Sequence, residues 1–176
     1  MSKPRIIPVT DNNAPDHSAK SLDEIGKVLG NVPNVFRTVA HSPAALRSMW
    51  SQHVAAADMR LSPRVRAAIG LRVAKLNDCD YCQAAHVALS QRAGVDEATA
   101  NGFRQGQSND PKEQTLLALT TKIVKDRGHH AGFVVDTARQ VGVSDAEIIE
   151  VIALISLHTF TNYVTNVANT HLDEHP

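Results

Sequence analysis

Along this chain the hydrophobic and polar residues show no convincing strand-like alternation, and apolar segments are instead bounded by helix start and stop signals. Each expected helix begins with a capping residue and proline or with a capping box, or ends at a glycine. The expected helices run from the capping box Ser21–Glu24 to Gly30, from Ser42-Pro43 to about Met59, from Ser62-Pro63 to Leu76, from Asp110-Pro111 to near Gly128, and onward from the capping box Ser144–Glu147. Because the turns between them are short, neighbouring helices should pack antiparallel into an all-α bundle.

Two features indicate how the chain is divided. Residues 1–17 contain three prolines and several small polar residues, so we expect an extended N-terminal arm there and one all-helical domain over residues 18–176. Within that domain, residues 89–98 resemble residues 137–146, at an offset of 48 positions, in a helix, a Gly-Val turn, a cap and the next helix. The similarity indicates either a common helix–helix turn or a duplicated helix-turn-helix unit, and both interpretations stay open.

Charge and hydropathy narrow the classes of partner. The chain has 18 basic and 18 acidic residues and no run of lysine or arginine, which argues against nucleic acid or an anionic membrane as the main partner. The N-terminus has no apolar signal segment. The longest apolar stretch, Ile148–Leu157, is interrupted by Glu150 and is shorter than the ~20 residues of a membrane span. We therefore expect a soluble protein of the reducing cytoplasm that acts on a small molecule or a protein.

The two cysteines carry the strongest chemical signal. Cys79 and Cys82 are three residues apart, and His86 follows four residues later, so all three can share one face of a helix. Asn77 and Asp78 are the expected cap residues, which places both cysteines in a first turn where the helix dipole stabilises a thiolate; a protonated His86 would lower a cysteine pKa further. Spacing alone then assigns Cys82 as the nucleophile and Cys79 as its partner.

Other interpretations of the motif remain in competition. Both cysteines could be structural, although redox spacing followed by a histidine is atypical of scattered buried cysteines. A zinc site from Cys79, Cys82, His86 and one remote ligand is chemically sound, but such sites normally take a second regular pair, so we expect no metal. No G-x-G-x-x-G fingerprint is present, so we expect no bound flavin or nucleotide, and electrons would come from an external thiol.

A polar stripe follows the last expected helix. It consists of His158, Asn162, Asn166 and Asn169, in a segment otherwise rich in apolar residues. We favour a solvated face or a contact between subunits, and the alternative is that His158 borders the dithiol pocket. Four other histidines receive no role: His41, His53, His129 and His130.

Several segments together resemble a known family. They are Glu24–Gly26 and Val32–Arg37, Ser42–Leu46, Leu61–Arg64, the stretch Leu76–His86 with its C-x-x-C-x-x-x-H core, Ser144–Glu147, and Thr161–Asn166. They resemble the AhpD-like group of the carboxymuconolactone decarboxylase superfamily, particularly its peroxidase-related branch. The resemblance implies an AhpD-like helical bundle, assembly into trimers or hexamers, and thiol-dependent hydroperoxide reduction. Cys82 then looks like the peroxide-attacking residue, Cys79 the resolving one and His86 part of the proton relay, with a lipoylated or thioredoxin-like protein as reductant.

One position departs from the family pattern. A glutamate commonly stands twelve residues before the first cysteine, where this chain has Ala67. Loss of a proton-transfer partner costs on the order of a hundredfold in rate, which weakens dithiol chemistry without removing it. Two other functions therefore stay open: a cofactor-free decarboxylase like others of the superfamily, and a redox-sensing protein without turnover.

Overall fold

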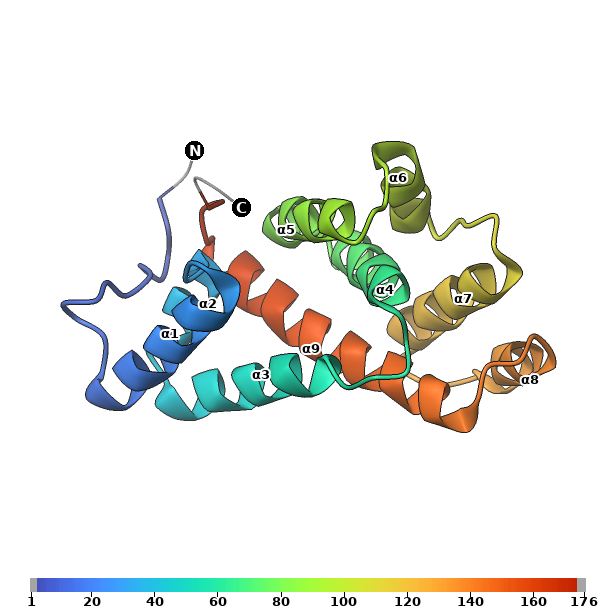
Figure 1. Cartoon of the computed structure of the whole chain (residues 1–176), viewed down its shortest axis with the longest axis horizontal. Helices are drawn as coiled ribbons and strands as arrows, with labels where there is room; N and C mark the ends of the chain where they lie inside the picture. Colours follow the sequence, from blue (N-terminus) through green and yellow to red (C-terminus); the bar gives the residue numbers. More distant parts are fainter. Residues whose placement is uncertain (1–2, 174–176) are drawn as a thin grey trace.

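The computed structural model describes residues 3–173, which form nine α-helices and no strand (Figure 1). The fold class expected from the sequence is therefore confirmed. The helices are α1 (Asp16–Leu29), α2 (Asn34–Val39), α3 (Pro43–Ala56), α4 (Pro63–Leu76), α5 (Asp80–Arg92), α6 (Glu97–Gln105), α7 (Pro111–Asp126), α8 (Gly132–Gln140) and α9 (Asp145–Ala168).

The long helix α9 is the core helix of the fold. It contacts α2, α3, α4, α5 and α7, and its buried side chains include Val151, Leu154 and Leu157. Within the described residues α9 alone has the length and apolar composition of a membrane span, yet half of that apolar window is buried inside the protein. Its hydrophobicity is explained by this burial against the other helices.

Most helix starts lie where the sequence predicts them. Pro63 and Pro111 open α4 and α7, and the capping box at Ser144 is present at the start of α9. The start of α1 was predicted wrongly: this helix begins at Asp16, so the expected capping box at Ser21 lies inside it and the expected arm ends two residues early. The rigid φ of Pro15 and the acidic side chain of Asp16 in the first turn favour the earlier start.

The internal similarity extends over three helices. Helices α4 and α7 begin 48 positions apart, as do α6 and α9, and the two Gly-Val turns both have a left-handed glycine, with φ of 75° at Gly94 and 81° at Gly142. In both turns the valine N–H is bonded to a carbonyl five residues back, at 2.9 Å. The common helix order and turn geometry support a duplicated unit that is longer than the two helices seen in the sequence.

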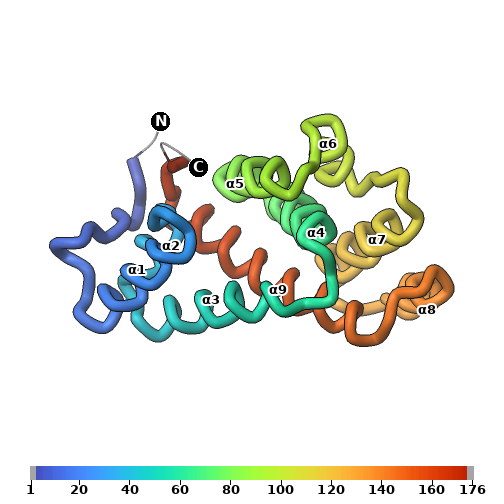
Figure 2. The backbone as a smooth tube through the Cα atoms, viewed as in Figure 1, coloured from blue at the N-terminus to red at the C-terminus, as the bar shows by residue number. Residues whose placement is uncertain are grey.

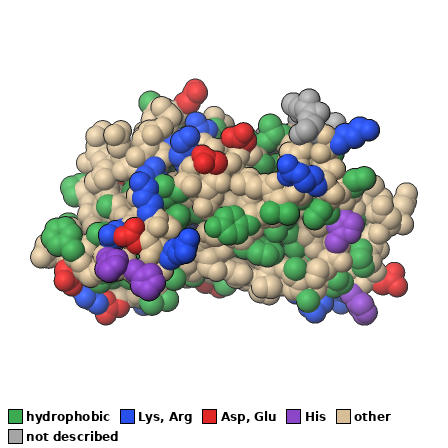
Figure 3. Space-filling view, turned by 180° about the vertical axis from the view of Figure 1, so that it is seen from behind, with side chains coloured by type: hydrophobic (Ala, Val, Ile, Leu, Met, Phe, Trp, Pro, Cys, Tyr) green, Lys and Arg blue, Asp and Glu red, His purple; other side chains and the backbone are tan. Residues whose placement is uncertain are grey.

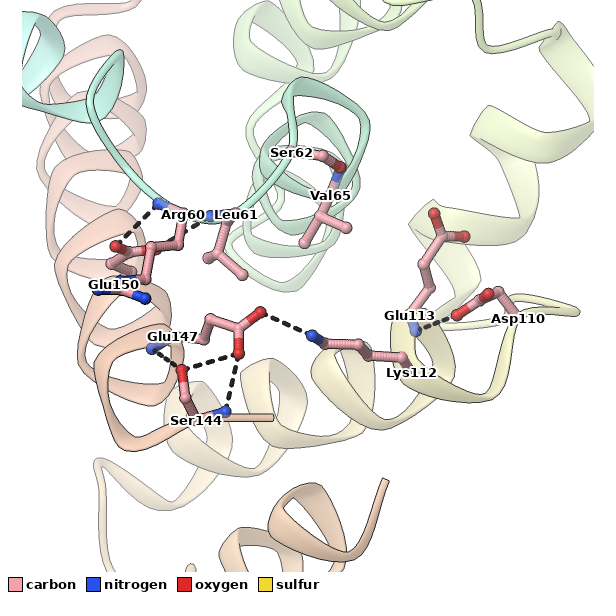
Figure 4. Close-up of polar contacts among 10 residues, drawn as sticks. All are labelled: Arg60, Leu61, Ser62, Val65, Asp110, Lys112, Glu113, Ser144, Glu147 and Glu150. Carbon is pink, nitrogen blue, oxygen red and sulfur yellow. Dashed lines mark hydrogen bonds and ion pairs between the residues drawn. The ribbon is translucent and has the colours of Figure 1, made fainter. Parts of the chain in front are cut away.

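Polar contacts hold one end of the bundle together (Figure 4). The carboxylate of Glu147 accepts from the backbone N–H of Ser144 and pairs with Lys112 of α7 at 2.7 Å. One turn later, the Glu150 carboxylate accepts from the backbone N–H groups of Arg60 and Leu61, at 3.0 and 3.1 Å. These contacts fix the start of α7 and the α3–α4 loop on α9, and with them the position of α4.

The two ends of the described chain lie close together (Figure 2). The Arg5 N–H donates to the Ala168 carbonyl at 2.7 Å, and the Asn169 amide donates to the Lys3 carbonyl at 2.9 Å. Beyond α9, the Asp173 carboxylate accepts from the Asn34 N–H at 2.7 Å. The C-terminal segment therefore covers the start of α2, next to the first turn of α5.

Candidate redox site

The first turn of α5 is built around its own cysteines. Cys79 is the N-cap, and its sulfur accepts a hydrogen bond from the Cys82 N–H at 3.1 Å, so Cys82 lies in the first helical turn. The prediction that Asn77 and Asp78 cap this helix is wrong. Asn77 ends α4, and Asp78 adopts a left-handed conformation with φ of 48° that turns the chain from α4 into α5.

The two sulfurs are joined as a disulfide, and they differ in exposure. Cys79 is fully buried, whereas Cys82 retains 4% of its surface and lines a cavity. The hydroxyl of Thr165, on α9, lies 3.0 Å from Cys79 Sγ and 3.4 Å from Cys82 Sγ. Thr165 could not be predicted from the sequence, because no local pattern shows that it faces a segment more than 80 residues away.

The asparagine stripe of α9 holds the cysteine loop in place. Asn162 is fully buried and accepts from the Asn77 side-chain amide at 3.0 Å, while the Asn166 amide donates to the Asn77 carbonyl at 3.0 Å. The favoured interpretation of a solvated face or a subunit contact is therefore wrong for Asn162. These bonds fix the α4–α5 loop, and hence Cys79, against α9.

A cavity of about 190 Å³ opens beside Cys82. Helix α5 forms one wall, and α1, α2, α3, α9 and the C-terminal segment form the rest. The lining residues are Leu29, Asn31, Pro33, Val35, Phe36, His53, Tyr81, Cys82, Ala85, His86, Ala88, Leu89, Arg92, His158, Thr161 and Asp173. The structure thus places three residues named from the sequence, Cys82, His86 and His158, in one cavity, which His53 also lines. Cys79 does not line this cavity.

Three imidazoles meet in this cavity from three different helices. The rings of His86 and His158 lie edge to face, with centroids 4.6 Å apart, and the ring of His53 contacts Phe36 at 5.3 Å. His86 lies directly on α4, because a Cβ placed on Gly70 would be 2.7 Å from its ring. Gly70 is therefore required for the observed position of His86.

The imidazoles are held in their neutral form. Burial, and secondarily the nearby His53, lowers the pKa of His86 to about 4, and burial lowers the pKa of His158 well below its usual value. Burial also lowers the pKa of His53. In the disulfide state the protonated His86 considered in the sequence analysis is therefore a minor form at neutral pH, and its ring is a hydrogen-bonding group and proton acceptor.

Two imidazole nitrogens are buried without a protein partner. Within the described part of the chain, His158 Nε2 and His53 Nδ1 make no hydrogen bond. An unsatisfied buried nitrogen costs about 1–3 kcal/mol, so both favour a bound ligand or solvent molecule. A role for His53 could not be predicted from the sequence, since its place in the cavity depends on how α3 packs on α9.

Tyr81 closes one side of the cavity. Its hydroxyl donates to Asp173 Oδ2 at 2.6 Å and accepts from the Val35 N–H at 3.2 Å. Burial, followed by the Asp173 carboxylate, raises the pKa of Tyr81 above its usual value, so the phenol stays protonated. The same carboxylate binds the Asn34 N–H, which joins α2, α5 and the C-terminal segment at this wall.

Two further groups bear on the expected chemistry. Ala67, at the position of the family glutamate, is buried on α4 one turn before Gly70. Its methyl side chain provides no carboxylate for a proton relay. Over residues 3–173, no three His, Cys, Asp or Glu side chains converge as a set of metal ligands.

The fold and this site define an all-α protein of the AhpD-like fold with a C-x-x-C pair beside its cavity. Residues 41–103, which contain α4, α5 and both cysteines, match the model of the carboxymuconolactone decarboxylase family. Among curated proteins, none matches the chain.

Three solved structures illustrate the likeness. An AhpD-core, uncharacterized peroxidase-related protein from Ralstonia eutropha JMP134 has a TM-score of 0.86 and 22% identity, covering 99% of this chain and 94% of the other. An uncharacterized peroxidase-related protein from Silicibacter sp. TM1040 has a TM-score of 0.83 and 21% identity, covering 99% and 96%. A variant of the debrominase Bmp8 in complex with 2,3,4-tribromopyrrole has a TM-score of 0.81 and 16% identity, covering 99% and 94%. At these identities the likeness establishes the fold.

Proposed function

We propose that this protein is a thiol-dependent alkyl hydroperoxide reductase that cycles between the Cys79–Cys82 dithiol and its disulfide. The observation that carries the proposal is the asymmetry of the pair: Cys82 faces a cavity lined by three imidazoles, and Cys79 lies buried directly behind it. A nucleophile that meets substrate and a protected partner that closes a disulfide need this arrangement.

In the first step, the Cys82 thiolate attacks the terminal oxygen of a hydroperoxide. The S–O bond forms as the O–O bond breaks, and the alkoxide takes a proton and leaves as an alcohol. Neutral His86, one turn along α5, accepts the Cys82 proton and returns it to the alkoxide. His158 Nε2, which has no hydrogen-bond partner in the described chain, can hydrogen-bond the bound peroxide.

In the second step, Cys79 resolves the sulfenic acid on Cys82. Its sulfur forms the S–S bond, and the departing hydroxide leaves as water with the Cys79 proton. The dithiol has then given two electrons to the peroxide, and an external thiol restores it by attacking Cys82, the sulfur that faces the cavity. A lipoylated or thioredoxin-like protein is the proposed reductant, and the reducing cytoplasm is the proposed compartment.

Because Ala67 has no carboxylate, the proposed proton relay has one group fewer than the family pattern. Without that acid, a neutral imidazole can pass a proton directly or through solvent in the cavity. We therefore propose a peroxidase slower than its relatives by on the order of a hundredfold in the proton-transfer step.

A second reaction uses the same two electrons. A dithiol can also reduce a carbon–bromine bond, with hydrogen replacing bromine, bromide leaving and the disulfide forming. The protein of similar fold named debrominase Bmp8 motivates this second candidate. Phe36 and His53, which are in edge-to-face contact in the cavity, offer ring surfaces that favour a planar aromatic ligand such as a pyrrole. Cofactor-free decarboxylation would instead leave both cysteines idle, and a redox sensor would form the disulfide without turnover.

One experiment separates these functions. The reduced protein is treated with one equivalent of cumene hydroperoxide, and intact mass and thiol titration follow whether Cys79 and Cys82 lose two hydrogens together. Rapid stoichiometric loss that dithiothreitol reverses over many cycles supports the peroxidase, and a single oxidation without turnover identifies a sensor. Oxidation by a brominated pyrrole but not by the peroxide points to debromination. Turnover of a lactone substrate by the Cys79→Ser, Cys82→Ser double variant would identify a decarboxylase.

We also propose that the chain forms a homo-oligomer, a trimer or a hexamer, through the outer face of α9. Figure 3 shows hydrophobic side chains gathered across the middle of the face seen from behind. The exposed apolar side chains of α9 form two groups at helical spacing, with a gap of two turns between them: Ile149 and Ile152, then Phe160, Tyr163 and Val167. A long apolar stripe of this kind is typical of a protein–protein interface.

A further inference from the structure

One wall of the cavity follows α5 from end to end. The α5 residues that line it include Cys82, Ala85, Leu89 and Arg92, which recur at helical spacing on one face. Cys82 and Arg92 are ten positions apart, which corresponds to about 15 Å along a helix. The cavity is therefore elongated, with the reactive sulfur toward one end and a guanidinium toward the other.

The middle of the cavity is apolar. On α5 the lining includes the small side chains of Ala85 and Ala88, and the apolar lining residues from α1, α2 and the loop between them are Leu29, Pro33, Val35 and Phe36. Between Tyr81 and Arg92, the α5 residues that line the cavity are Cys82, Ala85, His86, Ala88 and Leu89, and burial keeps His86 neutral. An alkyl chain is the ligand that this surface favours.

The far end of the cavity suits an anion. Arg92 is exposed, and its guanidinium has no hydrogen-bond or ion-pair partner among residues 3–173. The one acidic lining residue, Asp173, is already bonded to the Asn34 N–H and the Tyr81 hydroxyl. Arg92 is therefore the charged lining group available to a ligand, and guanidinium groups bind carboxylates with paired hydrogen bonds.

From these observations we infer that the substrates are medium-chain alkyl hydroperoxides with a terminal carboxylate, of roughly ten carbon atoms for a length of about 15 Å. The peroxide lies at Cys82, the chain follows α5, and the carboxylate pairs with Arg92. This inference rests on the proposed peroxidase function. The dithiol supplies two electrons, the O–O bond breaks, and the products are a hydroxy acid and water.

The test compares three peroxides in single turnover of the reduced protein, so that no reductant is needed. They are a ten-carbon hydroperoxy carboxylic acid, its methyl ester and tert-butyl hydroperoxide. We expect the wild type to react about tenfold faster with the acid than with the ester, as a charge-assisted hydrogen bond at a part-exposed site allows. Arg92→Gln should remove that preference by slowing the acid alone, and Arg92→Lys should keep part of it.

Two controls make the result specific. Arg47, exposed on α3 and outside the cavity, provides the matched variant Arg47→Gln, which should behave like the wild type. Ala88→Leu should narrow the groove and slow both ten-carbon peroxides without slowing tert-butyl hydroperoxide. Equal rates for acid and ester in the wild type, or equal slowing of all three peroxides by Arg92→Gln, would overturn the inference.

Binding distinguishes failure of the site from failure of the chemistry. The ten-carbon hydroxy acid is titrated calorimetrically into the disulfide form of wild type and Arg92→Gln. Tighter binding to the wild type supports the site even if no peroxide oxidises the cysteines, in which case the peroxidase proposal alone fails. Binding that is the same in both proteins counts against the site, whatever the peroxide kinetics.

Discussion

The Thr165 hydroxyl lies 3.0 Å from Cys79 Sγ, in a region where both side chains are buried. The same hydroxyl donates to the carbonyls of Thr161 and Asn162, at 3.0 and 3.1 Å. In the reduced protein its oxygen can accept from the Cys79 thiol, or its hydrogen can turn to the thiolate. In the proposed mechanism, Thr165 is thus a positioning residue for the protonation of Cys79, the proposed resolving cysteine.

Replacing Thr165 tests that role. Thr165→Val keeps the shape of the side chain but removes the hydroxyl, so the Cys79 thiolate loses a hydrogen bond of about 1.5–3 kcal/mol. We expect the pKa of the reduced Cys79 thiol to rise, because its thiolate loses a donor, and disulfide closure to slow about tenfold or more. Thiolate absorbance against pH and stopped-flow oxidation measure both. Thr120→Val, at a buried threonine of α7 that also bonds its own helix, is the matched control.

The two cysteines should give different products when each is replaced. Cys82→Ser leaves the buried Cys79 alone, so we expect no reaction with hydroperoxide and complete loss of turnover. Cys79→Ser keeps the nucleophile in the cavity, so one oxygen atom should add as a sulfenic acid that dimedone traps. Intact-mass spectrometry after one equivalent of peroxide distinguishes the two. Full peroxidase activity in Cys82→Ser would contradict the proposed nucleophile.

Acid should destabilise the protein through its buried imidazoles. The pKa of His86 is about 4 in the folded chain and about 6.5 when unfolded. Between these values the unfolded state binds more protons, so the free energy of unfolding falls as pH falls from 6.5 towards 4 and is fully retained above 6.5. His158 and His53 contribute with the same sign. Urea unfolding across this pH range measures how steeply the free energy of unfolding depends on pH. His86→Gln should weaken that dependence. The same dependence in the variant would disprove a neutral His86 in the folded protein.

Gly70 should be intolerant of even one methyl group. In Gly70→Ala the new Cβ would lie 2.7 Å from His86 Cε1, so the ring or α5 must move. We expect a peroxide reaction slower by at least tenfold while the helical content is retained. Gly132→Ala, at the first residue of α8 with no atom near the added Cβ, is the control and should react normally. A normal rate in Gly70→Ala would show that the position of His86 is unimportant.

The exposed stripe of α9 predicts how assembly can be broken. Tyr163 and Val167 lie one turn apart on it and are mostly exposed, at 59% and 65%. Tyr163→Lys combined with Val167→Lys should place two charges in the apolar interface and yield a monomer. Light scattering after size exclusion measures the mass. A control pair on the α7 surface, Lys122→Glu with Lys125→Glu, should leave the mass unchanged, and a monomeric wild type would refute the oligomer.

Local signals in the sequence were sufficient for most of the fold. The starts of three helices were predicted at Pro63, Pro111 and Ser144. A cap residue followed by proline, or a capping box, determines a helix start through contacts within a single turn. The short helix α2 was not predicted, since its six residues depend on burial of Val35 and Phe36 against the core. The early start of α1 was missed for a related reason, because Ser18 inside it bonds the distant Ala40 carbonyl.

The site was only partly predictable. Cys79, Cys82 and His86 are close in sequence, so helical spacing brings them together. His53 and Thr165 come from α3 and α9, and their meeting with α5 depends on packing between helices that no spacing rule describes. The effect of burial on His86 could not be predicted either, because it requires knowledge of what covers the ring.

The difference in exposure between the two sulfurs also constrains the order of events in catalysis. In the proposed cycle, peroxide and reducing thiol both react at the sulfur of Cys82, and both reach it through the cavity that this residue lines. The two substrates therefore exclude each other, and the alcohol must leave before the thiol can enter. Steady-state rates should follow ping-pong kinetics, with parallel lines in double-reciprocal plots, and excess thiol should inhibit competitively against peroxide.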